Sequence, residues 1–264
     1  MNSQRRAPGA PLFLKEMGKS NMTIEIDCEG RELFDTLTPE QLPVVLPFSL
    51  REIDGEMTVS VWEEALEIAH YVDSLPEEER FSVGTMETVR EMTVRVMKEF
   101  GFEDADIENN LLITKVMEKE EELNEGAILP ETRFVKNDDG LENLTSSPLN
   151  MYFDNLLAAG VVKDGKILSA AAENARVYLE DGQLNYDFDE DDAVRDICVE
   201  TAPGEEGKGY AASAVAYLTR ELLRMGKVVT YTLREDNPAS ERVAEKVGFR
   251  DKSKEFVVAC FRDE

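Results

Sequence analysis

A glycine-rich stretch has the residue types and the spacing that could bind an anion. Three glycines fall within six residues, directly before a predicted helix: Gly204, Gly207 and Gly209. Glycine permits a tight turn, and the unpaired backbone N–H groups at the start of a helix attract phosphate. Glu205 and Glu206 would repel a phosphate unless both carboxylates point to solvent and Lys208 offsets their charge.

Two familiar phosphate-binding patterns do not fit this loop. A P-loop requires Ser or Thr after the lysine, but Gly209 follows Lys208. A dinucleotide fingerprint beginning at Gly207 would require a third glycine at the position of Ala212. By itself, the loop favours an ordinary turn before a helix over an anion site.

A second motif changes this interpretation. Residues 237–249 read NPASERVAEKVGF and follow the loop in the chain after one helix and one strand-like run. Together the two segments resemble the GNAT superfamily of N-acetyltransferases. Its loop reads Gln or Arg, any two residues, Gly, any residue, and Gly or Ala. A later short helix begins N-x-x-S and ends in G-F. The matching positions are Glu206 to Ala211 for the loop, and Asn237, Ser240, Gly248 and Phe249 for the helix.

The resemblance covers roughly residues 127–264 and implies a fold and a co-substrate. The implied fold is α/β (α+β), with a GNAT-type mixed, mostly antiparallel central sheet flanked by helices and a helical N-terminal extension or domain. The implied co-substrate is acetyl-CoA: loop amides bind its pyrophosphate, and the preceding strand contacts its pantetheine arm and thioester. The implied binding residues are Val199, Glu200, Thr201, Glu206, Gly207, Lys208, Gly209, Tyr210, Ala211 and Asn237. Asn237 is equally well explained as the N-cap of a helix that begins at Pro238.

Two positions depart from the family pattern and keep alternatives open. Glu206 stands where the family prefers Gln or Arg, and Ala244 stands where many members place a tyrosine acid. The first hypothesis is an N-acetyltransferase that moves an acetyl group to an amine. The alternative is a degenerate GNAT-fold module that binds CoA or serves a regulatory or interaction role without catalysis. Transfer of a larger acyl group is a third hypothesis.

Candidates for the proton transfers of an acetyltransferase lie on strand-like runs. The reaction needs a base for the amine proton and an acid for the leaving thiolate. Glu200 and Tyr231 are the catalytic candidates, and Glu173 is a third carboxylate on a strand. Each is also explained as an ordinary strand residue. Cys198 and the single histidine, His70, are interpreted as packing or surface residues.

Hydrophobic periodicity predicts the elements that position these residues. Helices are predicted at 59–75 and 85–100, and a strand at 111–119. Further on, the pattern predicts a strand at 132–136, a helix ending at Gly160, a hairpin turning at Asp164-Gly165, a strand at 193–201, the helix after the loop, a strand at 228–235, a short helix to Gly248 and a terminal strand. The predicted organisation is a tail over 1–21, a helix-rich substrate-side region over 22–126 and an acetyl-CoA-binding domain over 127–264.

The composition limits the classes of partner that we expect the chain to bind. The 264 residues carry a formal net charge of −27, which repels nucleic acid and anionic membranes. Solubility or a saline habitat explains this charge, which would also suit a cationic small-molecule amine such as a polyamine or an aminoglycoside antibiotic, or a basic peptide. Three widely separated cysteines indicate neither a disulfide framework nor a metal site. No apolar run is long enough for a membrane span. We therefore expect a cytoplasmic protein, either a monomer or a homodimer.

Overall fold

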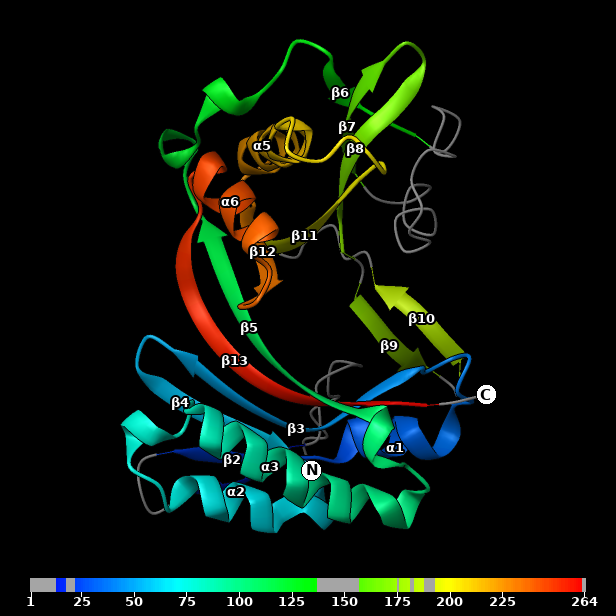
Figure 1. Ribbon diagram of the computed structural model, residues 1–264, viewed down its shortest axis with the longest axis vertical. Coiled ribbons are helices and arrows are strands. Elements are labelled where there is room, and N and C mark those ends of the chain that lie inside the picture. The colour runs from blue at the N-terminus through cyan, green and yellow to red at the C-terminus, as the bar shows by residue number, and fades with distance from the viewer. Residues whose placement is uncertain are drawn as a thin grey trace, which may run out of the picture. The chain divides into compact units, whose positions relative to one another are not determined.

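The chain forms two compact units that are not contiguous in sequence. The computed structural model describes residues 13–17, 22–136, 157–174, 176–180, 183–187 and 193–262. Unit 1 comprises Met1–Leu112, Tyr178–Asn185 and Ser253–Glu264, and unit 2 comprises Ile113–Val177 and Tyr186–Lys252 (Figure 1). The predicted division at residue 126 stays a prediction about domain organisation.

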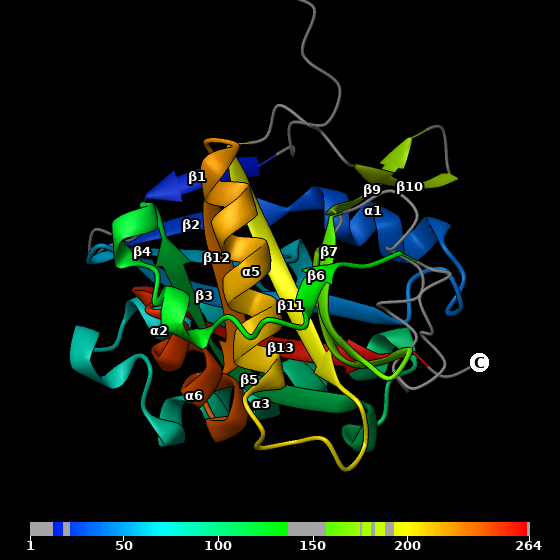
Figure 2. The same ribbon diagram turned by 90° about the horizontal axis from the view of Figure 1, so that it is seen from above.

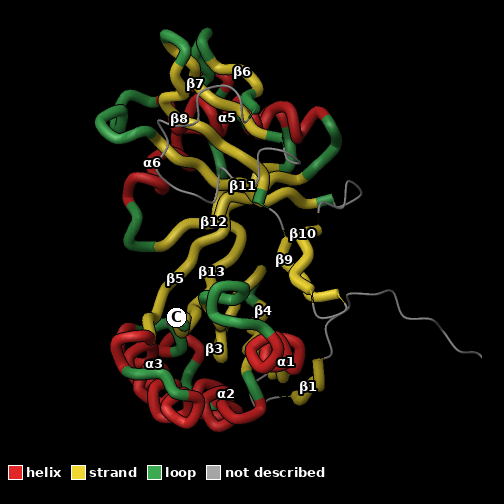
Figure 3. The backbone as a smooth tube through the Cα atoms, turned by 90° about the vertical axis from the view of Figure 1, so that its right-hand side faces the viewer, coloured by secondary structure: helices red, strands yellow, loops and turns green. Residues whose placement is uncertain are grey.

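Within its described residues, unit 1 combines a sheet with three α-helices. Its helices are α1 (Cys28–Thr36), α2 (Leu66–Asp73) and α3 (Val83–Met97). Its complete strands are β1 (Phe13–Met17), β2 (Thr23–Asp27), β3 (Val44–Ile53) and β4 (Glu56–Val61). It also contains the first part of β5 (Ile107–Met117), parts of β9 (Arg176–Glu180) and β10 (Gln183–Asp187), and most of β13 (Arg250–Phe261). Strand β13 pairs antiparallel with β3, which pairs antiparallel with β4. Figure 3 shows the long strands β5 and β13, each of which contributes residues to both units.

The helix predicted over 59–75 is wrong in its first part. Residues up to Val61 belong to strand β4, and helix α2 begins only at Leu66. Val59 and Val61 are buried on one face of the strand, while Ile68 and Val72 are buried on one face of the helix. A helical stripe and a strand alternation coincide at these apolar positions, so periodicity alone could not locate the change. The helix predicted over 85–100 is confirmed as α3.

Unit 2 has the predicted mixed, mostly antiparallel sheet flanked by helices. Its elements after β5 are β6 (Thr132–Phe134), β7 (Ala158–Lys163), β8 (Lys166–Glu173), β11 (Val194–Thr201), α5 (Tyr210–Arg224), β12 (Val228–Arg234) and α6 (Pro238–Val247). Hydrogen-bonded neighbours follow the order β5-β12-β11-β8-β7-β6. The pair β11–β12 is parallel, whereas the pairs β8–β11, β7–β8 and β6–β7 are antiparallel. Helix α5 runs along β11 and β12, with α6 beside it (Figure 2).

The β7–β8 hairpin forms as the Asp-Gly pair predicts. Asp164 and Gly165 both have positive φ angles, 52° and 76°, as a two-residue turn between strands of right-handed twist requires. The helix predicted to end at Gly160 is wrong for Ala158 to Gly160, which lie in β7, and the rest of that prediction falls mainly on residues outside the described ones.

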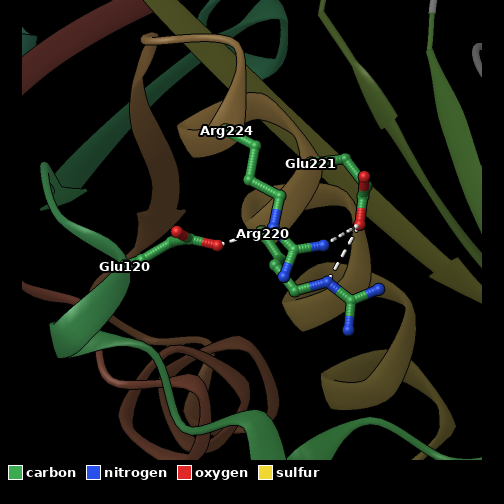
Figure 4. A network of polar contacts seen from close by, with 4 residues as sticks. All are labelled: Glu120, Arg220, Glu221 and Arg224. Atoms are coloured by element: carbon green, nitrogen blue, oxygen red, sulfur yellow. Dashed lines mark hydrogen bonds and ion pairs between the residues drawn. The ribbon is translucent and has the colours of Figure 1, made fainter.

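The segment between β5 and β6 holds helices α5 and α6 in place. Glu120 forms an ion pair with Arg224 at the end of α5, with 2.7 Å between Oε1 and Nε (Figure 4). Glu221 binds both Arg220 and Arg224 at 2.9 and 3.2 Å. Asn124 donates its backbone N–H to Val247 O and its side-chain N–H to Lys246 O, each at 2.9 Å. The ends of α5 and α6 are therefore both tied to one stretch of chain.

Across the described residues, no helix is both long enough and apolar enough to span a membrane.

Candidate functional site

The two parallel strands of unit 2 separate part-way along their length. Residues Val194 to Asp196 of β11 pair with Val228 to Thr230 of β12, and the pairing of these two strands ends at Asp196 and Thr230. From Ile197 to Thr201, strand β11 pairs with β8 on its other side. The edge of β11 that faces β12 therefore has backbone N–H and C=O groups beyond Asp196 that the ladder leaves unused. Such groups can hydrogen-bond an extended ligand.

The glycine loop follows directly on this separated stretch. Its three glycines have left-handed φ angles of 81°, 74° and 85° at positions 204, 207 and 209. Gly209 is the N-cap of α5 and offers no side chain to cap the helix. The first helical bond to Gly209 O comes from Ser213 N, at 3.1 Å. The N–H groups of Tyr210, Ala211 and Ala212 precede that bond and are available to an anion, with the helix dipole behind them.

Charges in the loop are arranged so that the amide donors stay accessible. The Glu206 side chain is exposed to solvent. Glu205 forms an ion pair with Lys208, with 2.7 Å between Oε2 and Nζ, and Lys208 also donates to Gly204 O at 3.1 Å. The hydrogen bond from Lys208 to Glu205 raises the pKa of Lys208. One of the two carboxylates is thus neutralised inside the loop, and the lysine is engaged there.

The predicted residues of β11 lie on opposite faces of the strand. Val199 packs against the core beneath α5 and α6, whereas Glu200 belongs to the other face. Ser169 Oγ on β8 donates to Glu200 O at 2.6 Å and lies 3.0 Å from Thr201 Oγ1. These bonds fix the end of β11, immediately before the loop.

Asp196 is a functional candidate that the sequence analysis missed. It occupies the last position at which β11 pairs with β12, and it accepts hydrogen bonds from Asn174 Nδ2 at 2.6 Å and Thr230 Oγ1 at 2.9 Å. Burial raises the pKa of Asp196, against the opposing effect of these hydrogen bonds. The available signal was its alternation with Cys198 and Glu200, which places the three side chains on one strand face.

Tyr231 lies on β12, one residue beyond the end of the pairing. Only 3% of its surface is exposed, and its ring packs against Phe249 with 5.9 Å between centroids. Burial raises the pKa of the Tyr231 hydroxyl, while a hydrogen bond with Ser240 on α6 acts in the opposite direction. Ser240 is one helical turn before Ala244, which is fully buried. The phenol therefore reaches α6 one turn from the position where the resemblance expects a tyrosine.

Asn237 acts as a helix cap in this structure. Its Oδ1 accepts from Ser240 N at 3.1 Å, and its backbone carbonyl accepts from Glu241 N at the same distance. The Nδ2 donor of Asn237 is the part of its side chain that this capping bond does not use. A capping role and a ligand contact are compatible, because they use different atoms.

Glu173 and Arg195 form an ion pair that accounts for the third carboxylate candidate. The distance between Arg195 Nε and Glu173 Oε1 is 3.2 Å, and Leu157 N donates to Glu173 Oε2 at 2.8 Å. Glu173 is only 6% exposed. A buried, paired and hydrogen-bonded carboxylate stabilises the end of β8 within the sheet. His70 is exposed on α2 in unit 1. Among the described residues, no three His, Cys, Asp or Glu side chains gather closely enough to hold a metal ion.

Thiol reactivity gives a first test of burial at the site. Burial raises the pKa of Cys198 to about 11 and that of Cys260 to about 12, whereas Cys28 is exposed. Because the thiolate is the reactive form, we expect one fast thiol at pH 8 and two that react at least ~100-fold more slowly. Stopped-flow labelling with a coloured disulfide reagent measures this. Cys28→Ser should remove the fast phase; equal rates for all three thiols would contradict the burial of Cys198.

A comparison with known protein families finds one match, in the second half of the chain. The family described as FR47-like protein matches residues 197–258, which include the separated part of β11, the loop, α5, β12 and α6. This match lies within the GNAT superfamily and confirms the resemblance for that segment. None of the curated proteins matches the chain.

Solved structures similar to this chain include several that are described as GNAT-family or GCN5-related acetyltransferases. A GCN5-related N-acetyltransferase-like protein from Streptococcus suis 89/1591 is 14% identical, with 95% of this chain and 83% of that chain covered and a TM-score of 0.47. An acetyltransferase from the GNAT family of Colwellia psychrerythraea is 16% identical, with 59% of this chain covered and a TM-score of 0.43. The match spans 57% of the Colwellia protein's own length.

Proposed function

We propose that this chain, whose C-terminal half is of the GNAT type, transfers an acetyl group from acetyl-CoA to an amine of a small molecule. One observation carries the proposal: the parallel strands β11 and β12 stop pairing just before a glycine loop that opens helix α5. An unpaired strand edge leading to unpaired helix amides offers hydrogen bonds to an extended amide chain that ends in phosphates.

In the proposed complex, the pyrophosphate, the pantetheine arm and the thioester of acetyl-CoA each have a counterpart in unit 2. The pyrophosphate accepts hydrogen bonds from the backbone amides between Gly207 and Ala211. The pantetheine amides pair with the free edge of β11 at Val199 to Thr201, and Asn237 Nδ2 is positioned to donate to the same arm. Backbone N–H groups of β11 beyond Asp196 are the available donors for the thioester oxygen as negative charge develops on it.

Two proton transfers complete the proposed reaction. Asp196, on the strand face shared with Glu200, takes the proton of the attacking amine either directly or through water. Tyr231, which is hydrogen-bonded to Ser240, gives a proton to the departing thiolate. It thereby takes the role of the tyrosine that many members of the family have at the position of Ala244. Binding both substrates in one orientation supplies much of the remaining rate enhancement.

The acceptor in this proposal is a cationic amine. The acidic chain, with its net charge of −27, would concentrate polyamine-like or aminoglycoside-like cations and exclude nucleic acid and anionic membranes. A cytoplasmic monomer or homodimer is consistent with this chemistry. The alternative, a non-catalytic CoA-binding or regulatory module, is favoured by Glu206 and Ala244.

Calorimetric titration with acetyl-CoA, followed by an amine screen that detects free CoA thiol, tests the proposal. Micromolar binding and amine-dependent thiol release are expected. Binding without thiol release across polyamines, aminoglycosides and basic peptides would favour the non-catalytic module. Absence of binding would overturn the proposed function.

Replacing Asp196 with asparagine tests the proposed base. Because burial raises the pKa of Asp196, kcat/KM should decrease as the pH is lowered through that pKa, which lies above the ordinary range of an aspartate. This decrease forms the acidic limb of the pH profile. Asp196→Asn should lower kcat/KM by about 100-fold or more and remove that limb. The matched variant is Glu200→Gln, on the same strand face. If Asp196→Asn keeps the limb and Glu200→Gln abolishes it, Glu200 is the base.

A further inference from the structure

The anion site of the loop lacks a free cation of its own. Glu205 and Glu206 bring two negative charges, and Lys208 is engaged by Glu205 and by Gly204 O. Backbone amides and a helix dipole attract phosphate, but an exposed carboxylate in the same loop opposes them. A second cation near the amides would restore the balance.

Lys246 on α6 places its ammonium group at the start of α5. A Cβ built on Gly209 would lie 3.0 Å from Lys246 Nζ, and this nitrogen is the one contact within 4 Å of that position. Lys246 is exposed on α6. Within the described part of the chain its ammonium group forms no ion pair, in contrast to Lys208. The charge is therefore available to a ligand at the loop.

The backbone that carries Lys246 is held firmly. Asn124 bonds to the carbonyl groups of Lys246 and Val247. The next residue, Gly248, has a φ angle of 108° and lies so close to Glu122 O that an added Cβ would be 2.3 Å away. The last turn of α6 is thus fixed beside the loop, and only the lysine side chain needs to adjust to a ligand.

We infer that Lys246 binds the phosphate groups of the nucleotide-bearing co-substrate, together with the amides at the start of α5, and offsets the charge of Glu206. This assignment rests on the proposed function, because it concerns the same site. It names a cation supplied by α6 rather than by the loop itself.

The test compares Lys246→Gln with wild type by calorimetric titration of CoA, 3′-dephospho-CoA and pantetheine. Lys227→Gln is the matched control, since it removes the same charge from unit 2 beyond the far end of α5. Loss of one charge-assisted hydrogen bond should weaken CoA binding about tenfold in Lys246→Gln and leave the control within about twofold. Affinity for pantetheine, which lacks the pyrophosphate and the 3′-phosphate, should be equal in all three proteins.

The outcomes separate the inference from the function on which it rests. A loss for CoA alone assigns Lys246 to the 3′-phosphate, and an equal loss for 3′-dephospho-CoA assigns it to the pyrophosphate. Equal CoA affinity in wild type and Lys246→Gln overturns the inference while the proposed cofactor site stands. An equal loss in both lysine variants also overturns it, because net charge would then explain the effect. If wild type binds no CoA, the proposed function itself fails.

Discussion

Replacing Gly209 with aspartate is expected to weaken acetyl-CoA binding at least ~100-fold. The new carboxylate would stand beside the first free amides of α5 and within reach of Lys246 Nζ, 3.0 Å from the added Cβ. It would occupy the donors meant for phosphate and neutralise the lysine. Loss of two charge-assisted hydrogen bonds, together with repulsion of the phosphate, accounts for an effect of this size. Calorimetric titration with acetyl-CoA measures the change.

The matched control is Gly204→Asp in the same loop. Gly204 has nearly the same φ angle, 81° against 85°, but a Cβ there meets nothing within 4 Å. Strain and added charge are therefore similar in the two variants, and only the position relative to the amides differs. Binding by Gly204→Asp should stay within a few-fold of wild type, with circular dichroism confirming that both variants are folded. Similar losses in both would show that loop charge or strain, rather than blocked amides, controls affinity.

Replacing Gly248 with alanine is expected to reduce the free energy of unfolding by about 3 kcal/mol or more. Two effects add: an L-residue is strained at a φ angle of 108°, and the new methyl group would lie 2.3 Å from Glu122 O. Backbone must move to relieve that clash, which would also disturb the bonds of Asn124 to the end of α6. Urea unfolding followed by circular dichroism measures the loss.

Gly226→Ala provides the comparison for strain without a clash. Gly226 follows α5 with a φ angle of 77°, and nothing lies within 4 Å of a Cβ there. Its replacement should reduce the free energy of unfolding by only about 1 kcal/mol. If the two variants lose the same free energy, the contact with Glu122 is not a constraint on the fold. A larger loss at Gly248 also predicts weaker CoA binding, because Lys246 precedes it in the same turn.

Several elements were predicted from signals that are local in the sequence. The Asp164-Gly165 turn, the apolar stripe of α5 and the cap at Asn237 each depend on a few neighbouring residues, and each lies where periodicity and capping place it. Strand β4 was mistaken for helix because its buried valines fit both periods. Strands β2 and β3 were missed although their signals are local: Ile24 and Ile26 alternate with polar residues in β2, and Asp54-Gly55, with φ angles of 52° and 83°, joins β3 to β4.

The candidate site was predicted only where its residues are consecutive in the sequence. The loop and the end of β11 are consecutive in sequence, so their motif could be read directly. Asp196 can be identified as a site residue only once the structure shows that the pairing of β11 with β12 ends there. Lys246 can be identified only once the structure shows that α6 packs beside the start of α5. Both depend on contacts between distant segments, which a single sequence does not reveal. The capping role of Asn237 and the core position of Ala244 were accessible to local reasoning.

The return of β13 to unit 1 sets the order in which the protein can fold during synthesis. Residues Ser253 to Phe261 pair with Val44 to Ile53, so the sheet of unit 1 receives one of its strands only after unit 2 has left the ribosome. Closing a loop of that length is slow, and the edge of β3 stays open to other strands in the meantime. We expect nascent chains that stop before residue 253 to be the aggregation-prone species, and chaperones to act mainly on them.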